Sequence, residues 1–208
     1  MSGNGHRLVS REGIPILLAL LLLSVAAYVF LGPGLALLFI ALFIFGLYLF
    51  RDPICEVPAE PLAVLSPASG KLVSISDVED YWISRRAKRI RINISAIDTH
   101  GLRSPIEGKV MNQWRATDPV EDFARHCAFW IQTDEADDLL LTLGMGKASM
   151  FTRVSLVAGE RAGQGQRCGF LYMSGVVDVY LPENARLLVG EGDSVKAGMT
   201  VLGHFIRQ

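Results

Sequence analysis

Residues 165–182 read GQRCGFLYMSGVVDVYLP, a segment in which a turn is followed by two apolar runs. Its first five residues have the composition of a turn, and residues 170–172 are apolar. Residues 176–181 are β-branched and apolar around one acid, until a proline ends the run. The pattern predicts a turn, a buried strand and a break. Ser174 and Gly175 interrupt the strand, and a glycine there often marks a bulge or a close approach to the backbone.

Short strands separated by turns are predicted along the whole second part of the chain. Residues 66–71 read SPASGK and residues 104–109 read SPIEGK, a near copy in which a turn leads into a strand. Residues 159–169 and 192–203 also place glycines between short apolar runs, and the second of these segments resembles the hairpins of lipoyl and biotinyl domains. This recurrence predicts a mainly β domain, built as a β-rich barrel-like sandwich.

A long uncharged stretch near the N-terminus predicts a membrane anchor. Residues 13–50 contain no charged side chain, and two apolar runs, residues 14–31 and 35–50, flank a Gly-Pro-Gly turn. These runs predict two α-helices that form a hairpin in the membrane. A secretory signal peptide is the alternative, but no small-residue cleavage site follows the apolar runs, and the second run follows the first directly.

The anchor defines the domain organisation that we expect. Residues 1–52 form the N-terminal membrane anchor, and residues 53–208 form the β domain. Arg7, Arg11 and Arg51 favour the cytoplasmic side of the inner membrane for both ends of the hairpin, and hence for the β domain.

Composition and residue spacing exclude several classes of function. The formal net charge is −1, so no bulk attraction to nucleic acid is indicated. The three cysteines are odd in number and lack CxxC spacing, which argues against a disulfide framework and against a thiolate metal site. The four histidines show no metal-binding spacing, so no metal is expected.

A basic segment precedes the second Ser-Pro turn. Residues 85–95 read RRAKRIRINIS, in which isoleucines alternate with polar residues, and this alternation predicts a half-buried strand. The basic side chains form a solvated face in one interpretation. In the other, Arg85, Arg86 and Arg89 contact anionic phospholipid near the membrane surface.

Nearly the whole chain is similar to the short, membrane-anchored form of the phosphatidylserine decarboxylases. The segments that carry the resemblance are the N-terminal hairpin, RDP at 51–53, SPA at 66–68, DTH at 98–100, GKV at 108–110 and VDVYLP at 177–182. The resemblance implies a proenzyme that cuts itself at a Gly-Ser bond and converts the serine into a pyruvoyl cofactor. It also implies phosphatidylserine as the substrate, phosphatidylethanolamine as the product, and membrane phospholipid as the partner, with a homo-oligomer left open.

The chain departs from the family at two of three positions of the self-cleavage triad. The family's histidine corresponds to His100, which is retained. The family's aspartate corresponds to Ser69, and its nucleophilic serine corresponds to Gly175, because Gly and Ser are exchanged. Ser174 is therefore the candidate nucleophile and the candidate pyruvoyl precursor. Strand alternation predicts that Ser174 faces away from His100 unless the strand is bulged at Gly175.

Two hypotheses follow from these departures. The first is a pyruvoyl-type decarboxylase processed at Ser174, and the second is a catalytically inactive member that binds an aminophospholipid or a protein partner. We expect the chain as it stands to cleave itself inefficiently. Exchanging Ser174 and Gly175, together with Ser69→Asp, is expected to restore cleavage, whereas Ser69→Asp alone is not.

Overall fold

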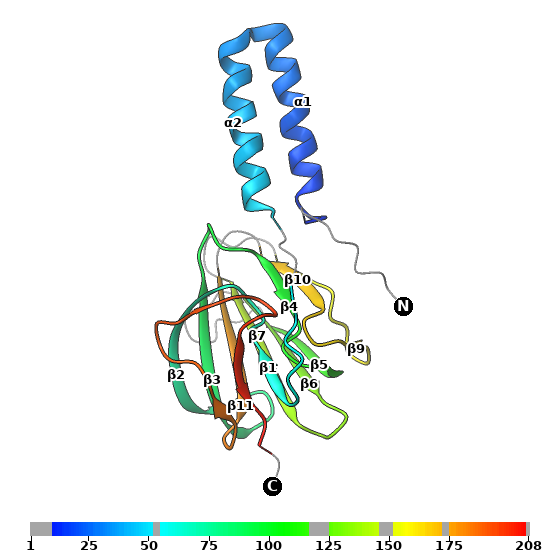
Figure 1. The fold of residues 1–208 in the computed structure, drawn as a ribbon. Coiled ribbons are helices and arrows are strands. Elements are labelled where there is room, and N and C mark those ends of the chain that lie inside the picture. The colour runs from blue at the N-terminus through cyan, green and yellow to red at the C-terminus, as the bar shows by residue number, and fades with distance from the viewer. Residues whose placement is uncertain (1–9, 52–54, 117–124, 146–151, 172–174, 207–208) are drawn as a thin grey trace. The chain divides into compact units, whose positions relative to one another are not determined.

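The computed structural model describes residues 10–51, 55–116, 125–145, 152–171 and 175–206 of the 208-residue chain. The chain divides into two compact units, residues 1–54 and residues 55–208. The first contains two helices, and the second is built from strands (Figure 1). The prediction of a mainly β domain preceded by two helices is therefore confirmed.

The N-terminal unit is a hairpin of two helices, α1 (Ile14–Leu31) and α2 (Pro33–Leu49). The turn between them is at Gly32, and a proline at the start of each helix suits the first helical turn. The open end of the hairpin is closed by the backbone N–H of Ser10, which donates to the carbonyl oxygen of Phe50 at 2.9 Å. Within the described residues, neither helix combines the length and the hydropathy that a membrane-crossing helix requires.

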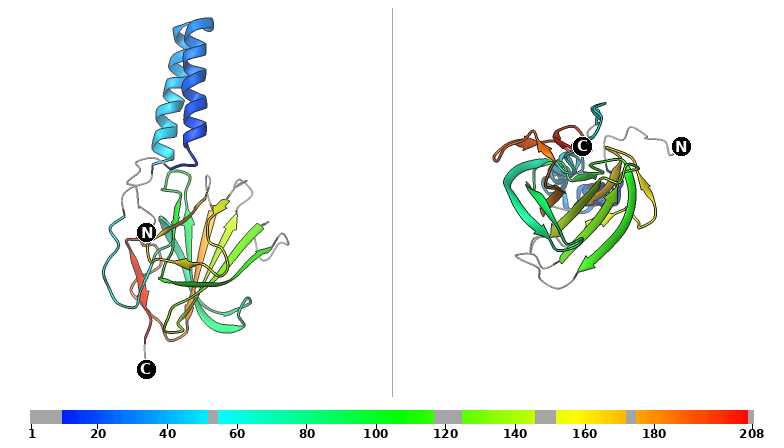
Figure 2. Two further views of the ribbon diagram at one scale, coloured as in Figure 1. Left: turned by 90° about the vertical axis from the view of Figure 1, so that its right-hand side faces the viewer. Right: turned by 90° about the horizontal axis from the view of Figure 1, so that it is seen from below.

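Among its described residues, the β unit contains one eight-stranded sheet and two three-stranded sheets, and every pairing is antiparallel. The large sheet has the order β13-β2-β3-β11-β7-β6-β5-β9, and it curls strongly (Figure 2). Its strands are β2 (Gly70–Asp80), β3 (Arg85–Ile94), β5 (Gly108–Ala116), β6 (Arg125–Gln132), β7 (Asp138–Met145), β9 (Arg161–Ala162), β11 (Gly175–Pro182) and β13 (Ser194–Val195). The small sheets are β1-β14-β12 and β4-β10-β8, from β1 (Ala63–Leu65), β4 (Gly101–Arg103), β8 (Thr152–Val154), β10 (Arg167–Leu171), β12 (Arg186–Leu187) and β14 (Val201–His204).

One face of the large sheet forms the hydrophobic core. Ile90 and Ile92 of β3 are 0% exposed and lie among Val177 and Val179 of the neighbouring strand β11. The alternating residues of β3 point to the opposite face, as the period of two in a strand requires. The half-buried strand predicted from the isoleucine alternation is therefore confirmed.

The two Ser-Pro turns are equivalent in structure as well as in sequence. The Oγ atoms of Ser66 and Ser104 each donate to the carbonyl oxygen two residues later, at 2.7 and 2.8 Å, and both serines are 0% exposed. The turns also exchange backbone bonds, because the N–H of Leu65 donates to Pro105 O and the N–H of Arg103 donates to Pro67 O. The sequence repeat is thus a pair of turns that are hydrogen-bonded to each other and have buried serines.

The structure differs from the single strand predicted around the Ser-Gly step. Strand β10 ends at Leu171 and pairs with β4 and β8, whereas β11 begins at Gly175 and pairs with β3 and β7. The chain therefore leaves a small sheet and enters the large sheet across this step. The prediction was wrong because a continuous apolar pattern does not reveal which distant strands will supply the pairing partners.

Candidate functional site

The backbone of His100 lies beside the end of β10. The N–H of Leu171 donates to the carbonyl oxygen of His100 at 2.9 Å, and Gly101 pairs with Phe170 in the register of β4 and β10. His100 is 1% exposed, and its ring centroid lies 5.9 Å from that of Phe170. The structure thus places this histidine, the candidate general base, at the strand that leads into the Ser-Gly step.

Gly175 occupies a tight position, in which a side chain would meet Leu171. A Cβ atom built on it would lie 2.5 Å from Leu171 Cδ2 and 3.0 Å from the carbonyl oxygen of Gly144. The first distance is far below van der Waals contact, and the carbonyl belongs to the paired strand β7. A serine at this position therefore requires Leu171 to move, which the sequence alone did not indicate.

Ser174, the candidate nucleophile, lies outside the described residues, as does Met173. On β11, Gly175 is on the same side as the buried Val177 and Val179, which face the core. Strand β11 begins at Gly175, and Ser174 lies before it. Strand alternation therefore does not test whether Ser174 faces away from His100. That expectation stays a prediction.

Ser69 is held in the turn that leads into β2. Its Oγ accepts a hydrogen bond from Thr99 Oγ1 at 2.7 Å and another from the backbone N–H of Ala197 at 3.0 Å. Thr99 directly precedes His100, so Ser69 is joined to the histidine's segment through one residue. Sequence reasoning missed both Thr99 and Ala197. The hydroxyl of Thr99 within the Asp-Thr-His segment was a possible signal for the first, and nothing in the sequence signalled the second.

The basic residues of β3 are distributed between the two faces of the strand. Arg85 donates through Nη2 to the carbonyl oxygen of Asp138 at 2.9 Å, and its side chain is 23% exposed. The side chain of Arg86 is 81% exposed, and by alternation it lies on the opposite side from Arg85 and Arg89. The three arginines therefore do not form one continuous surface, and their contact with anionic lipid stays a prediction.

The charged pair Arg91 and Asp178 joins the neighbouring strands β3 and β11. Arg91 donates through Nε and Nη2 to the two carboxylate oxygens of Asp178, both at 2.8 Å, and the Asp178 side chain is 7% exposed. This bidentate geometry is the strong form of an arginine–carboxylate interaction. It fixes β11 against β3 three residues after the Ser-Gly step.

The described residues contain no group of three or more His, Cys, Asp or Glu side chains suited to a metal ion. Burial raises the pKa of the Cys168 thiol to about 12, against a smaller opposing effect of Arg103. This cysteine is therefore a neutral thiol at physiological pH and not a nucleophile.

Proteins of similar length align with almost the whole chain. The "Phosphatidylserine decarboxylase proenzyme" of Nitrosomonas eutropha is 32% identical over 208 residues, which cover 96% of each chain. The protein of the same name from Aromatoleum aromaticum is 33% identical over 211 residues, covering 97% of this chain and 98% of the relative. That of Burkholderia ambifaria is 31% identical over 205 residues, covering 95% and 96%. No family model and no solved structure matches the chain.

Proposed function

Because the chain belongs to the family of phosphatidylserine decarboxylase proenzymes, we propose that it decarboxylates phosphatidylserine after cleaving itself, slowly, before Ser174. The observation that carries this proposal is the hydrogen bond from the backbone N–H of Leu171 to the carbonyl oxygen of His100, three residues before Ser174 in the sequence. Gly175, at the family's serine position, has no hydroxyl. Ser174 is the only serine or threonine between Leu171 and Gly175.

The proposed self-cleavage uses the hydroxyl of Ser174 and the imidazole of His100. His100 accepts the hydroxyl proton while Oγ attacks the carbonyl carbon of Met173, and the peptide bond is replaced by an ester. Elimination releases the Met173 carboxylate and leaves a dehydroalanine at residue 174. Water then replaces its nitrogen, which departs as ammonia and leaves a pyruvoyl group.

The residues present fit a pyruvoyl group, since a serine precedes Gly175 and a buried histidine lies at the strand before it. The pyruvoyl carbonyl supplies the electron acceptor for decarboxylation. Ser69 keeps the position of the family's carboxylate but has no charge to stabilise protonated His100. Such a loss slows a histidine-assisted serine reaction, which is why we propose slow cleavage.

A second candidate function is a non-catalytic member that binds an aminophospholipid or a protein partner. Two positions of the family's triad favour it. Ser69 has no charge, and Gly175 has no hydroxyl and packs against Leu171. In this case the chain stays intact, and the β domain serves as a binding module at the membrane.

A denaturing gel and a mass spectrum separate the two functions. The chain is purified from its own host, and a Ser174→Ala variant is the matched control. The decarboxylase proposal requires a C-terminal fragment of 35 residues, 174–208, with a pyruvoyl end, and conversion of phosphatidylserine to phosphatidylethanolamine. The Ser174→Ala chain is expected to remain whole. An intact, inactive wild-type chain would establish the non-catalytic function instead.

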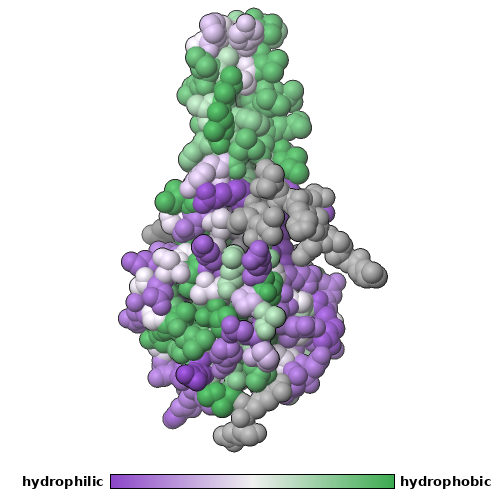
Figure 3. All heavy atoms as spheres, viewed as in Figure 1, coloured by the Kyte–Doolittle hydropathy of each residue, from purple (hydrophilic) through white to green (hydrophobic). Residues whose placement is uncertain are grey.

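We also propose that the helical hairpin attaches the chain to the inner membrane, with the β domain on the cytoplasmic side. The support is the exposure of large apolar side chains along both helices, such as Phe30 at 81% and Leu37 at 65% (Figure 3). The chain is expected to stay in the membrane pellet after high-salt and carbonate washing. Its release into the supernatant would contradict the proposal.

A further inference from the structure

Strand β11 carries a single charged side chain in an otherwise apolar run. Residues 176–181 read VVDVYL, and Asp178 is the only charged residue of the strand. If a strand is shifted along its neighbour by one residue, every side chain turns to the opposite face of the sheet. Val176 and Val177 are consecutive and lie on opposite faces, so the apolar residues distinguish the two faces of β11 poorly. The carboxylate of Asp178 is the side chain that distinguishes them best.

The partner of this carboxylate lies directly opposite on β3. Asp178 and Arg91 are register partners, and both carboxylate oxygens accept from the guanidinium group at 2.8 Å. The two side chains are 7% and 19% exposed, so either charge would be costly without the other. A shift by one residue would turn Asp178 toward the hydrophobic core. A shift by two residues would leave Arg91 opposite Val176 or Tyr180.

The register of β11 decides which residue of the Ser-Gly step lies at the start of the strand. In the observed register Gly175, at the family's serine position, lies opposite Ile94 of β3. Ser174 directly precedes Gly175 in the sequence. A shift of β11 by one residue would therefore bring Ser174 opposite Ile94, in the place that Gly175 now occupies.

We propose that Arg91 and Asp178 are positioning residues that set the register of β11, and so keep Gly175 rather than Ser174 opposite Ile94. The pair acts through the position of the strand, and setting a register is the best-attested role of a buried polar pair. The consequence for catalysis rests on the proposed self-cleavage. The pair slows that reaction, because it excludes the register in which Ser174 takes the place of the family's serine.

Disulfide bridges between the two strands measure the register directly. The full chain in detergent carries Ser174→Ala, so that cleavage does not interfere, and its three native cysteines are replaced by alanine. Asn93→Cys with Val176→Cys reports the observed register, because directly opposite residues have Cα atoms about 4.5–5.5 Å apart, which suits a disulfide. Ile92→Cys with Val176→Cys reports the register shifted by one residue, since these positions now lie on opposite faces. Mass spectrometry of the oxidised, digested chain quantifies each bridge.

Three paired variants are compared in both reporter chains. Arg91→Val with Asp178→Val removes both charges and leaves neither unpaired. We expect the bridge of the observed register to decrease by about tenfold, a ratio in the usual range for contacting charged residues, and the shifted bridge to form. Arg91→Asp with Asp178→Arg is expected to restore the observed register.

The matched control is the exposed ion pair between the ends of the same two strands. The atoms Arg86 Nη1 and Glu183 Oε1 lie 3.9 Å apart, and the side chains are 81% and 63% exposed. Arg86→Val with Glu183→Val is expected to leave both bridges unchanged, because an exposed pair contributes little. If the chain with valine at 91 and 178 does not fold, Asp178→Asn replaces it, since this change removes the charge at nearly the same size.

The possible outcomes separate the register from the cleavage. An unchanged bridge of the observed register after removal of both charges would overturn the proposal, because apolar packing and Gly175 would then suffice. Loss of this bridge without the shifted one, or without recovery in the charge-reversed chain, would overturn it as well. In the chain that retains Ser174, removal of both charges should release the fragment of residues 174–208 faster than in the wild type. A shifted register without faster cleavage would support the role of the pair and contradict the proposed function.

Discussion

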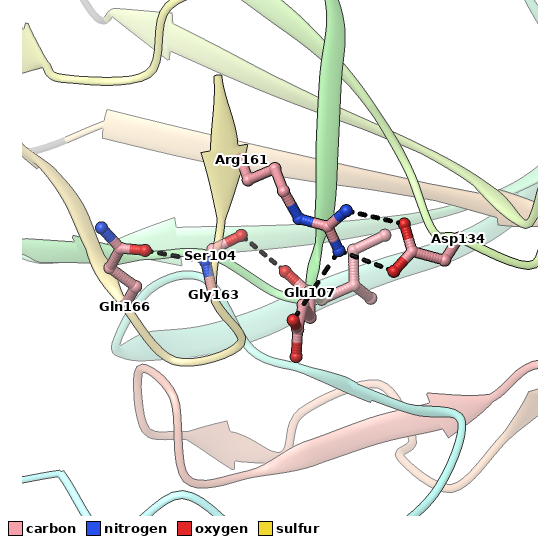
Figure 4. A network of polar contacts seen from close by, with 7 residues as sticks. Ser104, Glu107, Asp134, Arg161, Gly163 and Gln166 are labelled. Carbon is pink, nitrogen blue, oxygen red and sulfur yellow. Dashed lines mark hydrogen bonds and ion pairs between the residues drawn. The ribbon is translucent and has the colours of Figure 1, made fainter. Parts of the chain in front are cut away.

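The two Ser-Pro turns share the same pattern of hydrogen bonds, and their polar side chains differ at the fourth residue. In the first turn this residue is Ser69, which is bonded to Thr99 and to the backbone of Ala197. In the second it is Glu107, whose side chain is 70% exposed and lies 3.9 Å from Arg161 (Figure 4). Ser69 is linked to the segment of His100 through Thr99, whereas Glu107 faces Arg161. The same turn can therefore occur twice in one domain, and the side chain at its fourth residue determines whether a carboxylate is present there.

The largest effect is expected from returning a carboxylate to the first turn. In Ser69→Asp, the new side chain accepts from Thr99 and Ala197 as the serine does, and it adds a negative charge near His100. If Ser174 faces away from His100, as strand alternation predicts, Ser69→Asp alone leaves the rate of self-cleavage unchanged. If Ser174 is the nucleophile, as proposed above, the rate should rise by up to about 10⁴. A time course on a denaturing gel measures it, with Glu107→Asp in the second turn as the control that leaves the rate unchanged. An unaltered rate in Ser69→Asp would show that Ser174 is not within reach of His100.

The alternative position of the nucleophile, residue 175 instead of residue 174, is tested by exchanging Ser174 and Gly175. Ser174→Gly with Gly175→Ser in the Ser69→Asp background moves the hydroxyl to the position of the family's serine. Leu171→Ala must accompany it, because Leu171 Cδ2 lies 2.5 Å from the new Cβ position. Cleavage then yields 34 residues, 175–208, instead of 35. Mass spectrometry distinguishes the fragments, and a failure of this variant where Ser69→Asp succeeds would assign the nucleophile to Ser174.

A substantial loss of stability is expected from a methyl group in either turn. A Cβ atom on Gly70 would lie 2.3 Å from the backbone oxygen of Asn93, and one on Gly108 would lie at the same distance from that of Gln132. Because these oxygens belong to paired strands, Gly70→Ala and Gly108→Ala should each lower the free energy of unfolding by about 3 kcal/mol. Urea unfolding of the two variants measures it. A large effect in only one of them would show that the turns are not equivalent.

The smallest effects are expected from removing the two side chains that differ. Ser69→Ala loses two hydrogen bonds in a half-buried turn and should cost about 1–2 kcal/mol. Glu107→Ala loses an exposed ion pair at 3.9 Å and should cost less than about 0.5 kcal/mol. Thermal unfolding of both variants tests this order, which equal losses would contradict.

The elements that follow local patterns were predictable from the sequence. The alternation of isoleucines with polar residues gave strand β3, and the near copy of the Ser-Pro segment gave two equivalent turns. The pairing partners of β10 and β11 were not predictable, because the residues that pair with them lie dozens of positions away in the chain. The bond from Ala197 to Ser69 joins residues 128 positions apart, and no local pattern encodes such a contact.

The position of β11 determines whether folding or self-cleavage of the chain comes first. This strand lies between β3 and β7, and the later strands β13 and β14 pair with β2 and β1. A cut before Ser174 would therefore separate two polypeptides that share the eight-stranded sheet and the sheet β1-β14-β12. Of the three sheets, only β4-β10-β8 lies wholly in one piece, the N-terminal one. Folding has to come first and cutting second. If the chain is cut, the fragments on a gel would then show that it had folded, because a misfolded chain would lack the paired strands β3 and β7 on either side of β11.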